Sequence, residues 1–110
     1  MNRRNLFEAV HRTLLPGAEA AAFAGQGLMV NHVVLDHGTA VPAHRHPEEQ
    51  ITLVLEGRIA FQLEDEVCEL GPGDAIAVPP GASHAVRALL PSVVLDVFTP
   101  VRADLLEKLG

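Results

Sequence analysis

The chain has 110 residues, of which 48% are hydrophobic and 20% are charged, so it suits one folded domain and leaves no material for a second core. A net charge of -6 and an aromatic share of 4%, with no Trp and no Tyr, argue against nucleic-acid binding, which relies on positive charge and stacking side chains. The single cysteine, Cys68, excludes an intrachain disulfide and a cysteine-based zinc module, so the six histidines are the main candidate metal ligands.

Residues 1–26 form an N-terminal segment that we expect to be a strand or a turn and to join a dimer interface. Residues 6–15 suit either a helical turn or an edge strand, which Pro16 and Gly17 would end. The pair Arg3 and Arg4 resembles an export signal, yet no uninterrupted apolar run follows it. No apolar run reaches the roughly 18 residues that a bilayer requires. We therefore expect a cytoplasmic protein without a membrane partner.

Residues 27–110 contain short runs of strand-forming residues that are separated by clusters of glycine and proline. Such spacing is typical of an all-β sandwich or barrel. The last segment differs, because Leu105, Leu106 and Leu109 recur at helical spacing and predict a short C-terminal helix. The eight predicted strands are Leu28–Asp36, Ala40–His46, Gln50–Glu56, Arg58–Leu63, Glu66–Leu70, Ala75–Val78, His84–Ala88 and Val93–Phe98.

His44 and His46 stand one residue apart, so both imidazoles of an extended strand point to the same face and suit one metal ion. The spacing alone is equally consistent with two histidines that bond to the backbone. Gln50 begins the next predicted strand, and a third histidine, His84, opens a strand after a proline- and glycine-rich turn.

These residues resemble the two motifs of the cupin family, with the family's spacing and order. One position differs in each motif, since Gln50 stands where the first motif has glutamate and Ala88 where the second has asparagine. The residues that carry the resemblance are Gly38, His44, His46, Gln50 and Gly57 in the first motif and Gly73, Pro79, Gly81 and His84 in the second.

The resemblance implies an all-β, double-stranded β-helix (jelly-roll) barrel over residues 27–110. It also implies one divalent transition metal bound by His44, His46, Gln50 and His84. An amide oxygen is a neutral ligand, so Gln50 would hold the ion less tightly than a carboxylate. Glu48 and Glu49 are alternative donors, although both lie in a turn. Three imidazoles and one oxygen suit Zn, Ni, Mn, Fe or Cu, and the sequence does not select one of them.

The first motif and the stretch around Asp96 also resemble the KdgF-like group of cupins, named for a pectin-degradation protein. In that group the positions of Asp96, Phe98 and Arg102 line the pocket. A carboxylate in the apolar run Val93–Phe98 is costly unless it is used or paired, which fits a proton-transferring Asp96. Arg102 would clamp a substrate carboxylate, and Phe98 would form a wall. The alternatives are a capping Asp96, a core Phe98 and a solvated Arg102.

We therefore expect a metal-binding cupin with isomerase- or lyase-type activity on a small carboxylated sugar, in its sharpest form the linearisation of an unsaturated uronate. The alternatives are a sugar- or metabolite-binding protein without catalysis and a metal-dependent dioxygenase. We also expect a homodimer, because a small barrel leaves an apolar outer sheet face and strand edges that a second copy would cover.

Overall fold

The computed structural model describes residues 1–109 of the chain and consists of strands with one short helix at the end. Most strands end at glycine or proline, which interrupt the ladder, whereas β6 and β7 are joined by Glu64 and Asp65. The elements are β1 (Arg12–Leu15), β2 (Ala18–Ala24), β3 (Met29–Leu35), β4 (Ala40–His44), β5 (Glu49–Glu56), β6 (Ile59–Leu63), β7 (Glu66–Leu70), β8 (Ala75–Val78), β9 (His84–Ala88), β10 (Ser92–Thr99) and α1 (Ala103–Leu109).

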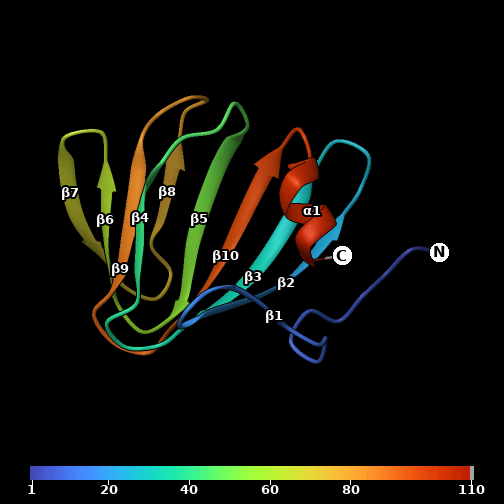
Figure 1. Cartoon of the computed structure of the whole chain (residues 1–110), viewed down its shortest axis with the longest axis horizontal. Helices are drawn as coiled ribbons and strands as arrows, with labels where there is room; N and C mark the ends of the chain where they lie inside the picture. Colours follow the sequence, from blue (N-terminus) through green and yellow to red (C-terminus); the bar gives the residue numbers. More distant parts are fainter. Residues whose placement is uncertain (110) are drawn as a thin grey trace.

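The strands form two antiparallel sheets that face each other (Figure 1). The larger sheet has the order β1-β2-β3-β10-β5-β8, and the smaller has the order β4-β9-β6-β7. Strands distant in sequence are neighbours, as in a jelly roll, where hairpins fold over onto one another. The predicted all-β jelly-roll fold with a short C-terminal helix is therefore confirmed.

The N-terminal segment adds two strands to the eight that the sequence indicates. β2 pairs with β3 along its full length, from Ala18 opposite Leu35 to Ala24 opposite Met29. Five of its seven residues are alanine, which has a low preference for strands, so this strand gives little signal in the sequence. β1 is shorter and pairs only with Ala18–Ala20, and Arg4 donates a 2.7 Å hydrogen bond to the carbonyl oxygen of Ala22 beyond it.

Inward-facing side chains of both sheets form the core, including Val54 and Phe61, which are fully buried. The turn between β5 and β6 closes tightly at Gly57, whose φ is 86°. A Cβ atom at this position would collide with the carbonyl oxygen of Pro91 and the hydroxyl of Ser92. Glycine at this motif position therefore allows the tight turn by which the chain passes from β5 in the larger sheet to β6 in the smaller one.

The outer face of the larger sheet is apolar, and Val34 and Ile51 are exposed on it, at 38% and 46%. The homodimer expected from the sequence, with a second copy over this face, stays a prediction. Helix α1 packs near β1, where Lys108 donates a 2.7 Å hydrogen bond to the carbonyl oxygen of Leu14. Among the described residues, no helix has the length and apolar character that a membrane crossing requires.

Candidate functional site

Three histidines converge between the two sheets. His44 at the end of β4 lies directly opposite His84 at the start of β9 in the antiparallel ladder, and His46 follows two residues after β4. One ring nitrogen of each histidine lies within 4.8 Å of those of the other two, as three ligands of one ion require. His84 is buried, and the His46 side chain is 7% exposed.

The backbone sets which nitrogen of each ring is available. The Nδ1 atoms of His44, His46 and His84 lie 2.9, 3.1 and 2.9 Å from the carbonyl oxygens of Pro42, Glu48 and Ala82, respectively. A neutral imidazole that donates from Nδ1 keeps its lone pair on Nε2. Burial lowers the pKa of His46 and His84, which favours that neutral form. His84 Nε2 is buried without a hydrogen-bond partner, so the set fits a cation.

Gln50 joins the histidines through its side-chain oxygen. Its Oε1 lies 3.0 Å from Nε2 of His46, while its Nε2 donates to Oγ1 of Thr52 at 2.9 Å and faces Oδ1 of Asp96 at 3.4 Å. If His46 donates from Nδ1, two lone-pair atoms face each other across that 3.0 Å, which is unfavourable unless a cation lies close to both. The four predicted ligands are thus together, with donor atoms of the right type.

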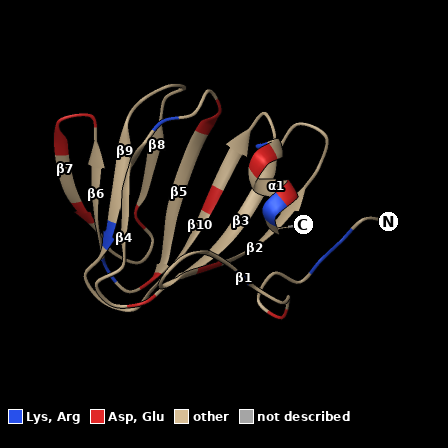
Figure 2. Cartoon of the chain, viewed as in Figure 1, with Lys and Arg blue, Asp and Glu red and all other residues tan. Residues whose placement is uncertain are grey.

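Asp96 lies behind the histidines and is held by Thr52. Thr52 donates to Oδ1 of Asp96 over 2.6 Å, and the two residues are register partners on β5 and β10. Burial raises the pKa of Asp96 to about 6, although the bond from Thr52 and the nearby Arg102 act in the opposite direction. Figure 2 shows one acidic stretch in the middle of β10, a strand that carries no other charge.

This network explains why glutamine replaces the glutamate of the cupin motif. A glutamate at position 50 would place two carboxylates about as close as the 3.4 Å that separates Gln50 Nε2 from Asp96 Oδ1. Like charges at such a distance disfavour the ionised state of both groups. The amide instead turns an oxygen toward the histidines, where a cation would be held, and an N–H toward Asp96, so one neutral side chain suits both neighbours.

Arg102 and Phe98 flank the same end of the pocket. The guanidinium carbon of Arg102 lies 5.1 Å from the centre of the Phe98 ring, and its Nη2 bonds to Asp104 over 3.1 Å. Arg102 Nε is buried without a hydrogen-bond partner and lies 4.0 Å from the Glu48 carboxylate. Arg102 Nε is therefore a buried donor without a partner, and the role of Arg102 in a carboxylate clamp stays a prediction.

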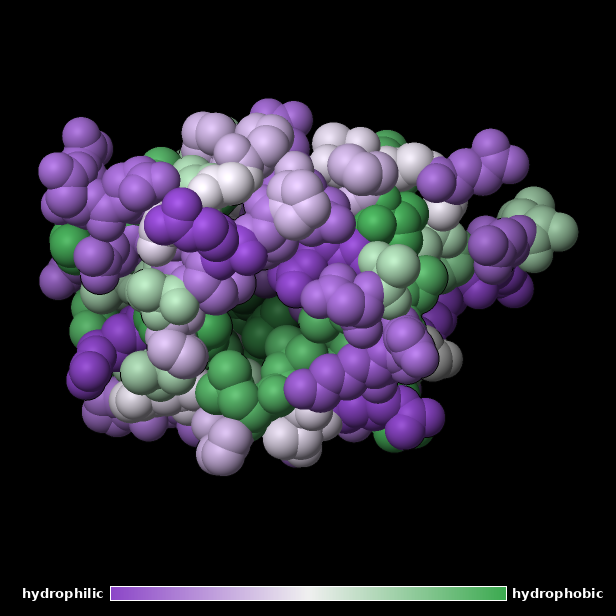
Figure 3. Space-filling view, turned by 45° about the horizontal axis from the view of Figure 1, so that its top comes forward, coloured by the Kyte–Doolittle hydropathy of each residue, from purple (hydrophilic) through white to green (hydrophobic). Residues whose placement is uncertain are grey.

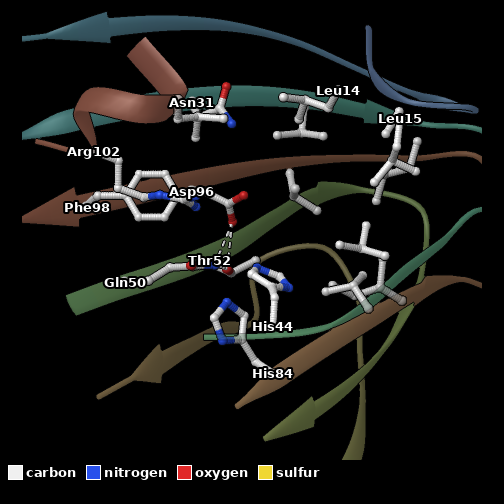
Figure 4. Close-up of a pocket in the computed structure, with 18 of the residues that line it drawn as sticks. Leu14, Leu15, Asn31, His44, Gln50, Thr52, His84, Asp96, Phe98 and Arg102 are labelled. Carbon is white, nitrogen blue, oxygen red and sulfur yellow. Dashed lines mark hydrogen bonds between the residues drawn. The ribbon is translucent and has the colours of Figure 1, made fainter. Parts of the chain in front are cut away.

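The pocket is a cavity of about 300 Å³ between the sheets. Figure 3 shows its mouth as a hollow with a hydrophobic floor beside hydrophilic surface. All the predicted site residues except His46 line it directly. His46 contacts the lining residues Gln50 and Phe98, and the centres of its ring and the Phe98 ring lie 5.7 Å apart. Figure 4 shows the polar residues gathered at one end, with His44 and His84 opposite Asp96.

Two polar lining residues, Thr52 and Asn31, were absent from the sequence prediction. Thr52 is two residues after Gln50, so the two-residue repeat of a strand places both on the inner face. Asn31 is the register partner of Asp96 on β3, is 1% exposed, and has an unpaired side-chain oxygen. A polar side chain within the apolar run Leu28–Asp36 was the available signal for it.

The other three histidines lie outside the pocket. His32 is on the outer face of β3, where its Nδ1 lies 2.8 Å from His11 Nε2 and its ring lies 5.0 Å from that of Phe7. His37 is exposed in a turn.

The comparisons with known proteins agree with this geometry. The family model described as "Cupin domain" matches residues 31–98, and the chain belongs to the cupin family. KdgF from Halomonas sp. is 34% identical, with a TM-score of 0.86 over 90% of this chain and 93% of that one. An RmlC-like cupin from Shewanella frigidimarina, 23% identical, has a TM-score of 0.85 over 90% of each chain and shows the fold alone.

One curated relative is longer. The dimethylsulfoniopropionate lyase DddQ of Ruegeria pomeroyi is 37% identical over 70 residues, which are 63% of this chain and 35% of that protein. The matched segment thus spans about a third of the length of the lyase. The structural comparison confirms what the motifs indicated, namely that the chain is a small cupin that resembles KdgF.

Proposed function

We propose that the protein is a metal-dependent enzyme that moves a proton on a small carboxylate-bearing substrate. The observation that carries the proposal is the placement of Asp96, which shares hydrogen bonds with Thr52 and Gln50 beside three converging histidines. His44, His46, His84 and Gln50 would hold the ion. When bound, such an ion acts as a Lewis acid toward a carbonyl or hydroxyl oxygen.

The remaining residues position the substrate. Arg102 has a buried Nε without a partner, so a substrate carboxylate is a suitable acceptor for it. Phe98 is 2% exposed and forms the wall beneath the guanidinium. Asp96 would take a proton from, or return one to, a substrate atom within reach of its carboxylate. These roles use the polar groups at this end of the cavity except Asn31.

The specific form of the proposal is conversion of a cyclic unsaturated uronate to its linear keto form, the activity that the motif resemblance implies. The 34% identity to KdgF over nine-tenths of the chain supports it. A lyase reaction on another carboxylate is the second candidate, because the name of DddQ describes a lyase that acts on a propionate derivative.

The test is turnover by protein that has been loaded in turn with Zn, Ni, Mn, Fe or Cu. An unsaturated uronate monomer is incubated with each form, and NMR follows the loss of the ring form. We expect turnover with at least one metal, and at least a hundredfold loss in Asp96→Asn with unchanged metal content. Asp65→Asn, at an exposed hairpin tip, is the matched control.

Three results would contradict the proposal in different ways. Full turnover by Asp96→Asn would remove the proton-transfer role. Tight uronate binding without turnover under any metal would favour the binding protein. Oxygen consumption that depends on iron and substrate would favour the dioxygenase.

A further inference from the structure

The cavity has two chemically different ends, and the proposed reaction uses only one of them. The polar lining residues, all at the end near Arg102 and Asp96, are Asn31, His44, Gln50, Thr52, His84, Asp96 and Arg102. In Figure 4 the side chains of Leu14 and Leu15 lie at the opposite end.

The opposite end has an apolar lining from both sheets. Its side chains are those of Leu14, Leu15, Ala18, Val33, Leu35, Val41, Ile59, Val86 and Val94. None of these side chains offers a hydrogen-bond donor or acceptor. Leu14, Leu15, Val41 and Val86 are half-buried and provide most of the accessible surface of this wall, whereas Ile59 is fully buried and Val33 is 5% exposed.

This lining selects what can occupy the space. The backbone groups of the sheets are already used in the strand ladders, so a hydroxyl placed there would lose its water without gaining a partner. Each such unpaired group costs roughly a factor of ten or more in affinity. Apolar carbon in the same place gains affinity, about fourfold for each methylene that leaves water.

We infer that the site also accepts an amphipathic carboxylate, with its head at Arg102 and the histidines and an apolar group of several carbons along Val33, Val86 and Leu15. The position of the head rests on the proposed function, whereas the apolar group follows from the lining alone. A sugar acid places its ring in the polar end and leaves the apolar end unused.

Binding of a chain-length series tests the inference. The zinc-loaded protein is titrated with acetate, butyrate, hexanoate and octanoate, and with galacturonate as a polar acid of similar bulk. We expect affinity to rise about fourfold per methylene until the apolar end is full. Hexanoate should then bind more tightly than galacturonate. Equal affinity along the series, or tighter binding of galacturonate, would overturn the inference.

Two variants of adjacent residues on β3 locate the effect. Val33 faces the cavity, whereas its neighbour Val34 is exposed on the outer face, so Val33→Thr and Val34→Thr make the same change on opposite sides of one strand. Val33→Thr should weaken hexanoate binding several-fold and leave acetate binding unchanged. Val34→Thr should change neither. Val86→Thr repeats the test from the smaller sheet if Val33→Thr unfolds at a lower temperature.

The outcomes separate this inference from the proposed function. The series reports binding, so a lack of turnover bears on the enzymatic proposal alone. If the protein converts a uronate but does not bind hexanoate, the proposed enzymatic function stands and the inference of an apolar group on the ligand is wrong. Equal hexanoate binding by the Val33→Thr and Val34→Thr proteins would show that the acid binds elsewhere, and would also overturn it.

Discussion

Thr52 donates a hydrogen bond of 2.6 Å to Oδ1 of Asp96, its register partner on the neighbouring strand. Thr52→Val removes the donor with little change in size, so we expect the rate to fall about tenfold or more, as for a lost bond to a charged group. Thr52→Ser should restore it. Because the bond lowers the pKa of Asp96, the acidic limb of the pH–rate profile should move to higher pH in Thr52→Val. If the acidic limb of the pH–rate profile does not move in Thr52→Val, Thr52 has a packing role only.

Metal removal should lower the stability of the protein. A ligand that binds only the folded state stabilises it in proportion to the logarithm of its concentration over Kd, by about 2.7 kcal/mol at a hundredfold excess. Treatment with a chelator should lower Tm by several degrees, and His84→Ala should lack both bound metal and this response. His37→Ala, an exposed turn residue, is the control. Wild-type metal content in His84→Ala, measured by elemental analysis, would place the ion elsewhere.

Gln50→Glu should restore the usual cupin ligand and create a conflict with Asp96. The new carboxylate would lie near Oδ1 of Asp96, where Gln50 Nε2 is now 3.4 Å away. We expect a lower Tm without metal, by repulsion, and a larger rise of Tm when metal is added, because a charged ligand binds the ion more tightly. Gln50→Glu combined with Asp96→Asn should regain the metal-free Tm. Calorimetry of the wild type and of both variants, each with and without metal, measures these changes in Tm.

The pair His32 and His11 should make the fold sensitive to acid. Burial, followed by the charge of His11, lowers the pKa of His32 below 6.5, while Glu56 acts in the opposite direction. As the pH falls, His32 therefore takes up a proton in the unfolded chain before it does so in the folded protein. The contribution of neutral His32 to stability is complete above pH 6.5 and is lost as the pH falls through the lowered pKa of the folded state. The urea midpoint should be lower at about pH 5.5 than at about pH 7.5.

His32→Gln should reduce this difference, whereas His37→Gln should leave it unchanged. The measurement uses metal-free protein, in which His46 and His84 respond in the same direction, so a residual difference is expected. An undiminished difference in His32→Gln would show that the outer pair does not contribute.

The sequence predicted the residues of the site better than it predicted their surroundings. The motif spacing identified His44, His46, Gln50 and His84, because turns of fixed length carry these side chains and the turn residues are visible in the chain. The Gln50 and Asp96 contact was not predictable, since it joins residues 46 positions apart and depends on strand order. β2 was missed because an alanine-rich strand has neither the branched residues nor the alternation that mark strands.

The apolar half of the pocket was missed for a different reason. Val33 and Val94 have the pattern of ordinary core residues, and no local feature distinguishes a valine that packs against protein from one that faces a cavity. The distinction depends on how far apart the two sheets lie, which is set by the sum of many side chains.

The bond from Arg4 to the carbonyl oxygen of Ala22 has a consequence for association. β1 pairs only with the first part of β2, so the rest of β2 is a free strand edge that could template another chain. A guanidinium seated on that edge occupies one acceptor and places a charge in the path of an incoming strand. The arginine thus leaves one fewer unpaired acceptor on the edge of β2, at the place where its covering strand β1 is too short.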